Sequence, residues 1–121
     1  MLNANKIFDE AKQNTGLSYL GNPLFEEGFN QLVYSINHEA DLNEIGIQAQ
    51  HHRLIGIISN MLRVEDAIKK NPEILKEQII APIVIVGLPR TGSTMTHRLL
   101  AADPRHTAML WWEGRYPAML P

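Results

Sequence analysis

Apolar side chains recur at steps of three and four residues over much of the first half of the chain. Between residues 24 and 40 this spacing connects Phe25, Phe29, Leu32, Val33, Ile36 and Ala40. A period of this kind predicts an amphipathic helix with one buried face. A second stripe, which predicts another helix reaching about residue 63, consists of Ile47, Leu54, Ile58 and Met61.

Local signals suggest where these helices begin and end. Asp41, followed three residues later by Glu44, resembles a capping box and predicts the start of the second helix. Residues 64–70 are expected to form a separate short helix that ends before Asn71-Pro72, because the residue before proline is pushed out of the helical region. Residues 72–78 are expected to add a further turn or two of helix.

The pattern changes at residue 81. Ile83-Val84-Ile85-Val86 is a β-branched run without polar alternation, which is typical of a strand covered on both faces in a parallel sheet. After a loop that starts at Gly87, residues 92–102 have helical spacing up to Asp103-Pro104. We therefore expect an α/β fold, with a helical region over residues 1–80. Residues 81–121 would form the first β-loop-α unit of a P-loop-like parallel sheet.

Composition limits the function classes. The 121 residues can form one core and hardly two, and the apolar, uncapped stretch 115–121 suggests a truncated chain. A net charge of −2 argues against a general nucleic-acid or anionic-membrane binder. The charge is uneven, however: residues 1–81 carry a net −4 and residues 82–121 a net +2. The second part is therefore expected to attract an anion.

Features that the sequence lacks exclude further classes of chemistry and location. The chain has no Cys, which excludes disulfides, thiolate catalysis and Cys-ligated zinc. No apolar run approaches about 20 residues, and the N-terminus lacks the order of a signal peptide. A cytoplasmic protein without an integral membrane segment is expected. His51-His52 is not expected to bind a metal, because adjacent helical side chains point about 100° apart.

The loop between the predicted strand and helix contains the strongest chemical signal. Gly87 to Thr94 has the glycine spacing of the phosphate-binding pattern G-x-x-x-x-G-K-S/T. Backbone N–H groups at a helix N-terminus, with the hydroxyls of Thr91, Ser93 and Thr94, would offer donors to an anion. Ser93 stands where nucleotide triphosphatases require Lys, so Arg90 is the cation of this loop.

These residues resemble the sulfotransferases that use 3′-phosphoadenosine 5′-phosphosulfate (PAPS), in particular a bacterial branch whose loop reads P-R-T/S-G-T/S-T. The resemblance also covers Thr15-Gly-Leu-Ser, Phe25-Glu-Glu-Gly, residues 97–104 and Trp111-Trp-Glu113. It implies binding of the 5′-phosphosulfate, without a metal, by Pro89, Arg90, Thr91, Gly92, Ser93 and Thr94. It also implies that Arg90 stabilises charge on the bridging oxygen as the sulfuryl group leaves.

By the same resemblance, Glu113 is the expected base that takes the acceptor proton, partly desolvated beside Trp111 and Trp112. The acceptor would carry a hydroxyl or an amine, on a small molecule or a polymer. The 3′-phosphate site is expected to lie outside this chain. The N-terminal helices are expected either to cover the acceptor site or to form a homodimer contact.

The sequence leaves other interpretations of these residues open. The loop could be a plain strand-to-helix turn, Arg90 part of a structural salt bridge, and Glu113 a helix N-terminal or surface carboxylate. His97 could simply be packed or solvent-facing. For the whole chain, a P-loop nucleotide kinase or other phosphotransferase is the alternative enzyme. A non-catalytic, truncated helical interaction module is the alternative of another class.

Overall fold

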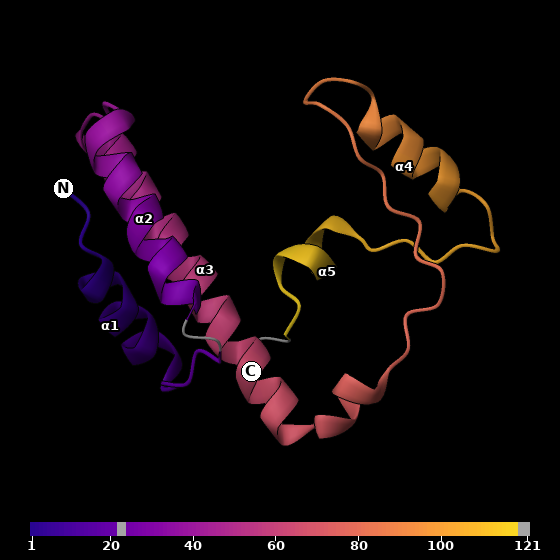
Figure 1. The fold of residues 1–121 in the computed structure, drawn as a ribbon, viewed down its shortest axis with the longest axis horizontal. Coiled ribbons are helices and arrows are strands. Elements are labelled where there is room, and N and C mark those ends of the chain that lie inside the picture. The colour runs from indigo at the N-terminus through magenta and orange to yellow at the C-terminus, as the bar shows by residue number, and fades with distance from the viewer. Residues whose placement is uncertain (22–23, 119–121) are drawn as a thin grey trace. The chain divides into compact units, whose positions relative to one another are not determined.

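The computed structural model describes residues 1–21 and 24–118, which fall into two compact units, residues 1–75 and Lys76–Pro117 (Figure 1). Every regular element among these described residues is helical. In chain order they are α1 (Ala4–Thr15), α2 (Leu24–Glu39), α3 (Glu44–Lys70), the 3-10 helix η1 (Pro72–Lys76), α4 (Ser93–Ala101) and α5 (Trp111–Arg115). The domain division into residues 1–80 and 81–121 stays a prediction.

Helix α1 was not predicted from the apolar pattern, although the sequence carries signals for it at both ends. The side chain of Asn3 accepts a hydrogen bond from the backbone N–H of Lys6 at 3.0 Å, which caps the N-terminus. Gly16 ends the helix in the left-handed conformation, with φ 68°. Between these caps, Ile7, Phe8 and Ala11 are buried. The short apolar stripe is therefore enough to define a helix once both caps are recognised.

Helices α2 and α3 confirm the two helices predicted from the stripes, with two differences. Asn43, not Asp41, caps α3: its side chain accepts from the N–H of Gly46 at 2.8 Å, while Asp41 lies in the loop with φ 44°. The helix also continues unbroken through residues 64–70 up to Asn71. Neither Pro nor Gly interrupts its hydrogen-bond ladder between residues 57 and 71, so no separate helix forms there.

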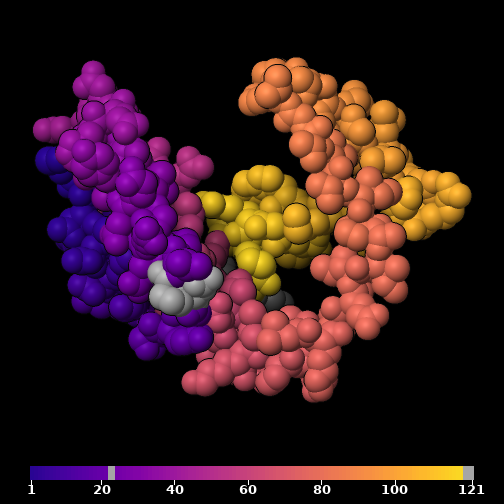
Figure 2. Space-filling view, in the orientation of Figure 1, coloured from indigo at the N-terminus to yellow at the C-terminus, as the bar shows by residue number. Residues whose placement is uncertain are grey.

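The core lies among these three helices. Ile7, Ile58 and Leu62 are the largest fully buried side chains, and α1 packs along α3. Phe8 of α1 and Phe29 of α2 pack in a tilted arrangement with ring centroids 4.8 Å apart, which connects α2 to the same cluster. In the space-filling view the side chains of α1 lie beside those of α2 over part of its length (Figure 2).

A polar contact secures the N-terminal segment to α2. The Asn37 side chain accepts from the Leu2 N–H at 2.8 Å and donates to the Leu2 carbonyl at 2.9 Å. Both backbone groups of Leu2 are thereby satisfied while its side chain stays buried in the core. This pair joins residues 35 positions apart and fixes where the chain enters α1.

The second unit corrects the predicted α/β fold. The predicted strand Ile83–Val86 is part of an extended segment without strand pairing, and the described residues contain no strand at all. The run has the β-branched side chains of a strand, but a strand forms only when another segment accepts its hydrogen bonds. No described segment provides that partner, and Ile83, Val84 and Val86 are exposed. The chain is helical, and the parallel sheet is wrong.

The predicted helices after residue 71 are found. η1 covers most of the turn expected over residues 72–78, and α4 covers most of the helix expected over residues 92–102. α5 was not predicted. None of the helices in the described part of the chain has the length and apolar character needed to cross a lipid bilayer.

Burial in the core determines how far a substitution destabilises the unit of residues 1–75, called the helical unit below. Ile58→Ala removes a fully buried side chain and should lower the free energy of unfolding by about 2–5 kcal/mol. Ile45→Ala, on the same helix but 77% exposed, should change it by about 0.5 kcal/mol or less. Urea denaturation followed by circular dichroism measures both. Equal effects of the two substitutions would show that the core is not where we place it.

Candidate functional site

The loop before α4 is a tight turn with two residues in the left-handed region. Arg90 has φ 68° and Gly92 has φ 88°, and α4 begins directly afterwards at Ser93. Glycine adopts this conformation without steric cost, whereas a residue with a Cβ does so at a cost of about 1–3 kcal/mol. The turn therefore places a cationic residue at a position where the backbone alone would favour glycine.

A side-chain hydrogen bond closes this turn. The Thr91 hydroxyl donates to the carbonyl of Leu88 at 2.6 Å. Its oxygen lies so close to Gly87 that a Cβ added there would be 2.9 Å away. Glycine at position 87 therefore allows the Thr91 hydroxyl to approach the backbone closely. The hydroxyl hydrogen of Thr91 is used within the loop, so Ser93 and Thr94 are the hydroxyl donors that remain for an external anion.

The N-terminus of α4 has no side-chain cap. Gly92 provides none, and the first helical hydrogen bond runs from the N–H of Thr96 to the carbonyl of Gly92 at 3.0 Å. The backbone N–H groups of the first turn therefore point out of the helix, where they carry the positive end of its dipole. Ser93 and Thr94 at this end are exposed. This end of α4 is suited to receive negative charge.

Arg90 supplies a full positive charge to the same loop. Within the described residues its guanidinium takes part in no ion pair or hydrogen bond, so the structural salt bridge considered for it is not observed there. Arg105 differs sharply. Its guanidinium binds both carboxylate oxygens of Asp103, with the shortest distance 2.6 Å. The charge of Arg105 is thus neutralised locally, whereas that of Arg90 is not.

Glu113 lies in α5, where it has a structural task. Its carboxylate accepts the backbone N–H of Leu110 at 2.6 Å, which is the return half of a capping box. The side chain of Leu110 cannot accept the other half. Glu113 is partly buried, but Trp111 and Trp112 are 79% and 57% exposed, so they do not form an enclosed apolar wall around it.

The six predicted loop residues, 89–94, are brought together because they are contiguous. Glu113 is not brought to them: within the described residues α4 and α5 do not pack against one another. His97, on α4, is exposed rather than packed. The roles assigned to Arg90 and Glu113 stay predictions.

The histidine pair is explained by contacts with other residues. His51 Nε2 lies 3.6 Å from Glu10 Oε1 of α1, an interhelical contact that sequence spacing could not reveal. His52 donates through Nδ1 to the carbonyl of Gln48 at 2.9 Å when that nitrogen is protonated. Residues 1–21 and 24–118 contain no group of three or more His, Cys, Asp or Glu side chains that could hold a metal ion.

The Asp103–Arg105 pair after α4 gives a testable pH dependence. Hydrogen bonds from the Arg105 side chain, and then from its backbone N–H, lower the pKa of Asp103 from 3.8 to about 2. A lowered folded-state pKa means that the stabilisation by this pair is present above pH 3.8 and is lost as the pH falls toward 2. Carboxyl-carbon NMR should show Asp103 titrating near pH 2, and at a higher pH in Arg105→Ala, which loses the side-chain hydrogen bonds but keeps the backbone N–H of residue 105. An unchanged midpoint in the variant would contradict the assigned cause.

Comparison with known proteins connects this loop to an enzyme family. A family model described as the sulfotransferase family matches residues 82–119, which include the loop, α4 and α5. No curated protein matches the chain significantly.

Two solved structures resemble the chain over nearly its whole length. Sulfotransferase STF1 from Mycobacterium tuberculosis H37Rv is 31% identical with a TM-score of 0.89, over 99% of this chain and 33% of that protein. Sulfotransferase STF9 from Mycobacterium avium is 29% identical with a TM-score of 0.85, over 97% of this chain and 30% of that protein. The chain thus spans about a third of the length of these enzymes. Residues 82–119 thus match the sulfotransferase family, and the chain as a whole is similar in sequence and fold to about a third of two mycobacterial sulfotransferases.

Proposed function

We propose that the chain is the donor-binding portion of a sulfotransferase, and that residues 89–94 bind the 5′-phosphosulfate of PAPS. The observation that carries this proposal is the uncapped N-terminus of α4, with the unneutralised Arg90 in the preceding turn. This arrangement lies inside the stretch that matches the sulfotransferase family. It offers what a sulfate or phosphate group needs: several N–H donors, two hydroxyls and a permanent cation.

Each part of the loop has its own task in this proposal. The first-turn N–H groups of α4 and the hydroxyls of Ser93 and Thr94 bind the equatorial oxygens of the anion. Thr91 and Gly87 maintain the turn through the contacts described above. Arg90 stabilises the negative charge that builds up on the bridging oxygen when the bond to sulfur breaks. Removing one such preorganised donor typically costs about 3–4 kcal/mol of barrier, or 10²- to 10³-fold in rate.

Glu113 is the proposed base that removes the proton from a hydroxyl or amine acceptor. Its capping bond to Leu110 does not exclude this role, because a carboxylate has about four lone-pair positions and the cap uses one. The acceptor oxygen or nitrogen attacks sulfur, the bond from sulfur to the bridging oxygen breaks, and 3′-phosphoadenosine 5′-phosphate leaves. The acceptor is a small molecule or a polymer. No metal is assigned to the reaction.

Donor binding can be tested directly by calorimetric titration of the chain with PAPS and with 3′-phosphoadenosine 5′-phosphate. Both should bind, and Arg90→Ala should weaken binding about tenfold or more, since a charge-assisted contact is lost. Arg98→Ala is the matched control: it removes the same charge from the exposed surface of α4 beyond the first turn and should change little. Equal losses of nucleotide affinity in the two variants would show that the loop contributes only general positive charge and no specific site.

The same titration with Mg-ATP tests the alternative enzyme class. Preference for Mg-ATP over PAPS would favour a phosphotransferase and overturn the proposal. A well-folded chain that binds a protein partner but no nucleotide would favour a non-catalytic helical interaction module.

The role of Glu113 is tested by comparing two substitutions. Glu113→Gln keeps a side-chain oxygen that can accept the N–H of Leu110 but cannot take up the acceptor proton, whereas Glu113→Ala loses both functions. In a sulfuryl-transfer assay Glu113→Gln should lower turnover about 10²- to 10⁴-fold and leave PAPS binding unchanged. A full rate in Glu113→Gln, with loss only in Glu113→Ala, would limit this residue to capping α5.

A further inference from the structure

An unusual backbone conformation lies in the extended segment between η1 and the candidate loop. Among the non-glycine residues that the structure describes, Asp41, Ala81 and Arg90 have a positive φ. Ala81, with φ 47°, is the least expected of the three. It precedes Pro82, and contact with the proline ring restricts the preceding residue to extended conformations. The left-handed backbone of Ala81 is therefore strained both by its own Cβ and by its neighbour.

The other two residues with positive φ are supported in this conformation, whereas Ala81 is not. Asp is one of the residue types that adopt it most readily. Arg90 lies in the turn that the hydrogen bond from Thr91 to Leu88 closes. Residues 77–87 take part in no hydrogen bond or ion pair within the described part of the chain, and all of them except Ile85 are exposed. A strained conformation persists only where its surroundings impose it, so Ala81 is free to leave the left-handed state.

The residues around Ala81 are stiffer than Ala81 itself. Apart from Ala81 and Pro82, every residue from 79 to 86 is Ile or Val. β-branched side chains have restricted χ1 angles and adopt a positive φ only as rare outliers. Proline fixes its own φ at about −65°. A change of chain direction within this run is therefore concentrated at one residue, Ala81.

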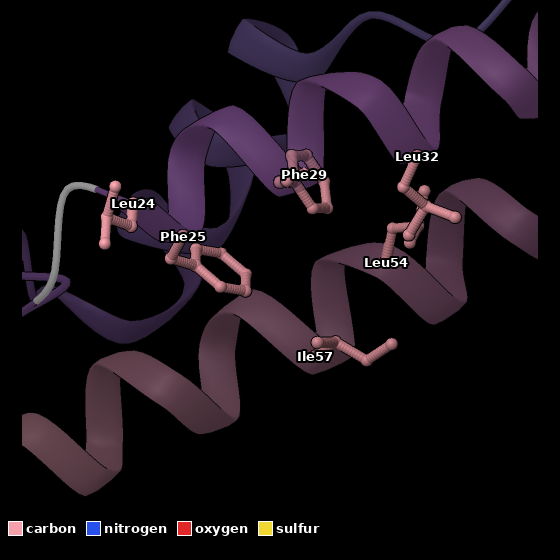
Figure 3. A pocket seen from close by; sticks show the side chains of 7 residues that line it. Leu24, Phe25, Phe29, Leu32, Leu54 and Ile57 are labelled. Atoms are coloured by element: carbon pink, nitrogen blue, oxygen red, sulfur yellow. The ribbon is translucent and has the colours of Figure 1, made fainter.

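The helical unit that precedes this segment is held together by side chains that meet between its helices. Figure 3 shows Phe25 and Phe29 pointing from α2 toward α3, with Leu32 facing Leu54. Phe29 and Leu54 are also buried in the core of the unit. Moving one of these helices against another would disrupt close packing, whereas rotating the backbone at Ala81 breaks no hydrogen bond or ion pair among the described residues.

We propose that Ala81 is a hinge with two backbone states: the left-handed state of this structure and the extended state that is typical of a residue before proline. Rotation at Ala81 changes the direction of the segment that starts at Pro82 and carries the candidate loop, without changing the loop itself. Hinges of this kind consist of a few residues that absorb a large change in φ and ψ. The proposal concerns the backbone of this segment and does not depend on what the loop binds.

Distances between two spin labels test the hinge. The chain has no Cys, so Ile45→Cys on α3 and Leu99→Cys on α4 introduce the two labelling positions, and both side chains are exposed. Double electron–electron resonance on the frozen, labelled chain should show two distance populations. A second labelled pair, Asp9→Cys and Ile45→Cys, lies within the helical unit and should show one population in every variant.

Substitutions at residue 81 should shift the two populations in opposite directions. Ala81→Gly removes the steric cost of the left-handed state and should raise the ratio of left-handed to extended chains about five- to thirtyfold. Ala81→Val should leave only the extended population, because a β-branched residue rarely adopts a positive φ. Ile80→Val is the matched control: it places the same residue where a β-branched side chain already stands and should change neither population.

Three results would overturn the hinge. A single distance population in all variants would show that the segment has one conformation. A broad distribution that is the same in Ala81→Gly and Ala81→Val would show that all of residues 77–87 are flexible and that Ala81 has no special part. A response to Ile80→Val as large as the response to Ala81→Val would show that the change of direction is not made at residue 81.

Discussion

The apolar cluster shared by α1, α2 and α3 is the interaction on which the rest of the structure depends. Ile7 of α1 and Ile58 and Leu62 of α3 are fully buried there, and the aromatic rings of Phe8 and Phe29 join α2 to them. Between Lys76 and Pro117 no residue is buried to the same degree. Since burial of apolar surface is the main favourable term in folding, the stability of the described chain resides in its helical unit. The loop of the candidate site gains its shape from local hydrogen bonds instead.

How far the sequence predicts this fold depends on where each element finds its hydrogen bonds. A helix satisfies its backbone groups within itself, so the stripes of α2 and α3 were sufficient to predict both helices. A strand needs a partner from elsewhere in the chain, and the apolar run at Ile83–Val86 has none among the described residues. The cap of α3 is Asn43 and not the predicted Asp41, because Asn and Asp are nearly equivalent as N-cap residues and the sequence alone does not distinguish them.

The candidate site also combines features that the sequence predicts with features that it does not. Residues 89–94 could be named as a candidate site from the sequence because a phosphate-type loop is contiguous and its glycines lie at fixed spacing. The left-handed backbone of Arg90, the bond from Thr91 to Leu88 and the capping bond of Glu113 could not be found in this way. They depend on backbone angles and on which of several acceptors a side chain reaches. Those choices follow only from the three-dimensional structure of the turn and of α5.

The backbone conformation of Arg90 places stability and chemistry in opposition at a single position. With φ 68°, this residue would be less strained as glycine, yet glycine would remove the cation that no described neighbour neutralises. A selection for thermal stability alone would therefore drive this position toward glycine and remove the charge. A selection that retains arginine despite the strain would reveal that the charge is needed. The residue found at position 90 thus shows whether backbone stability or the positive charge has been under the stronger selection.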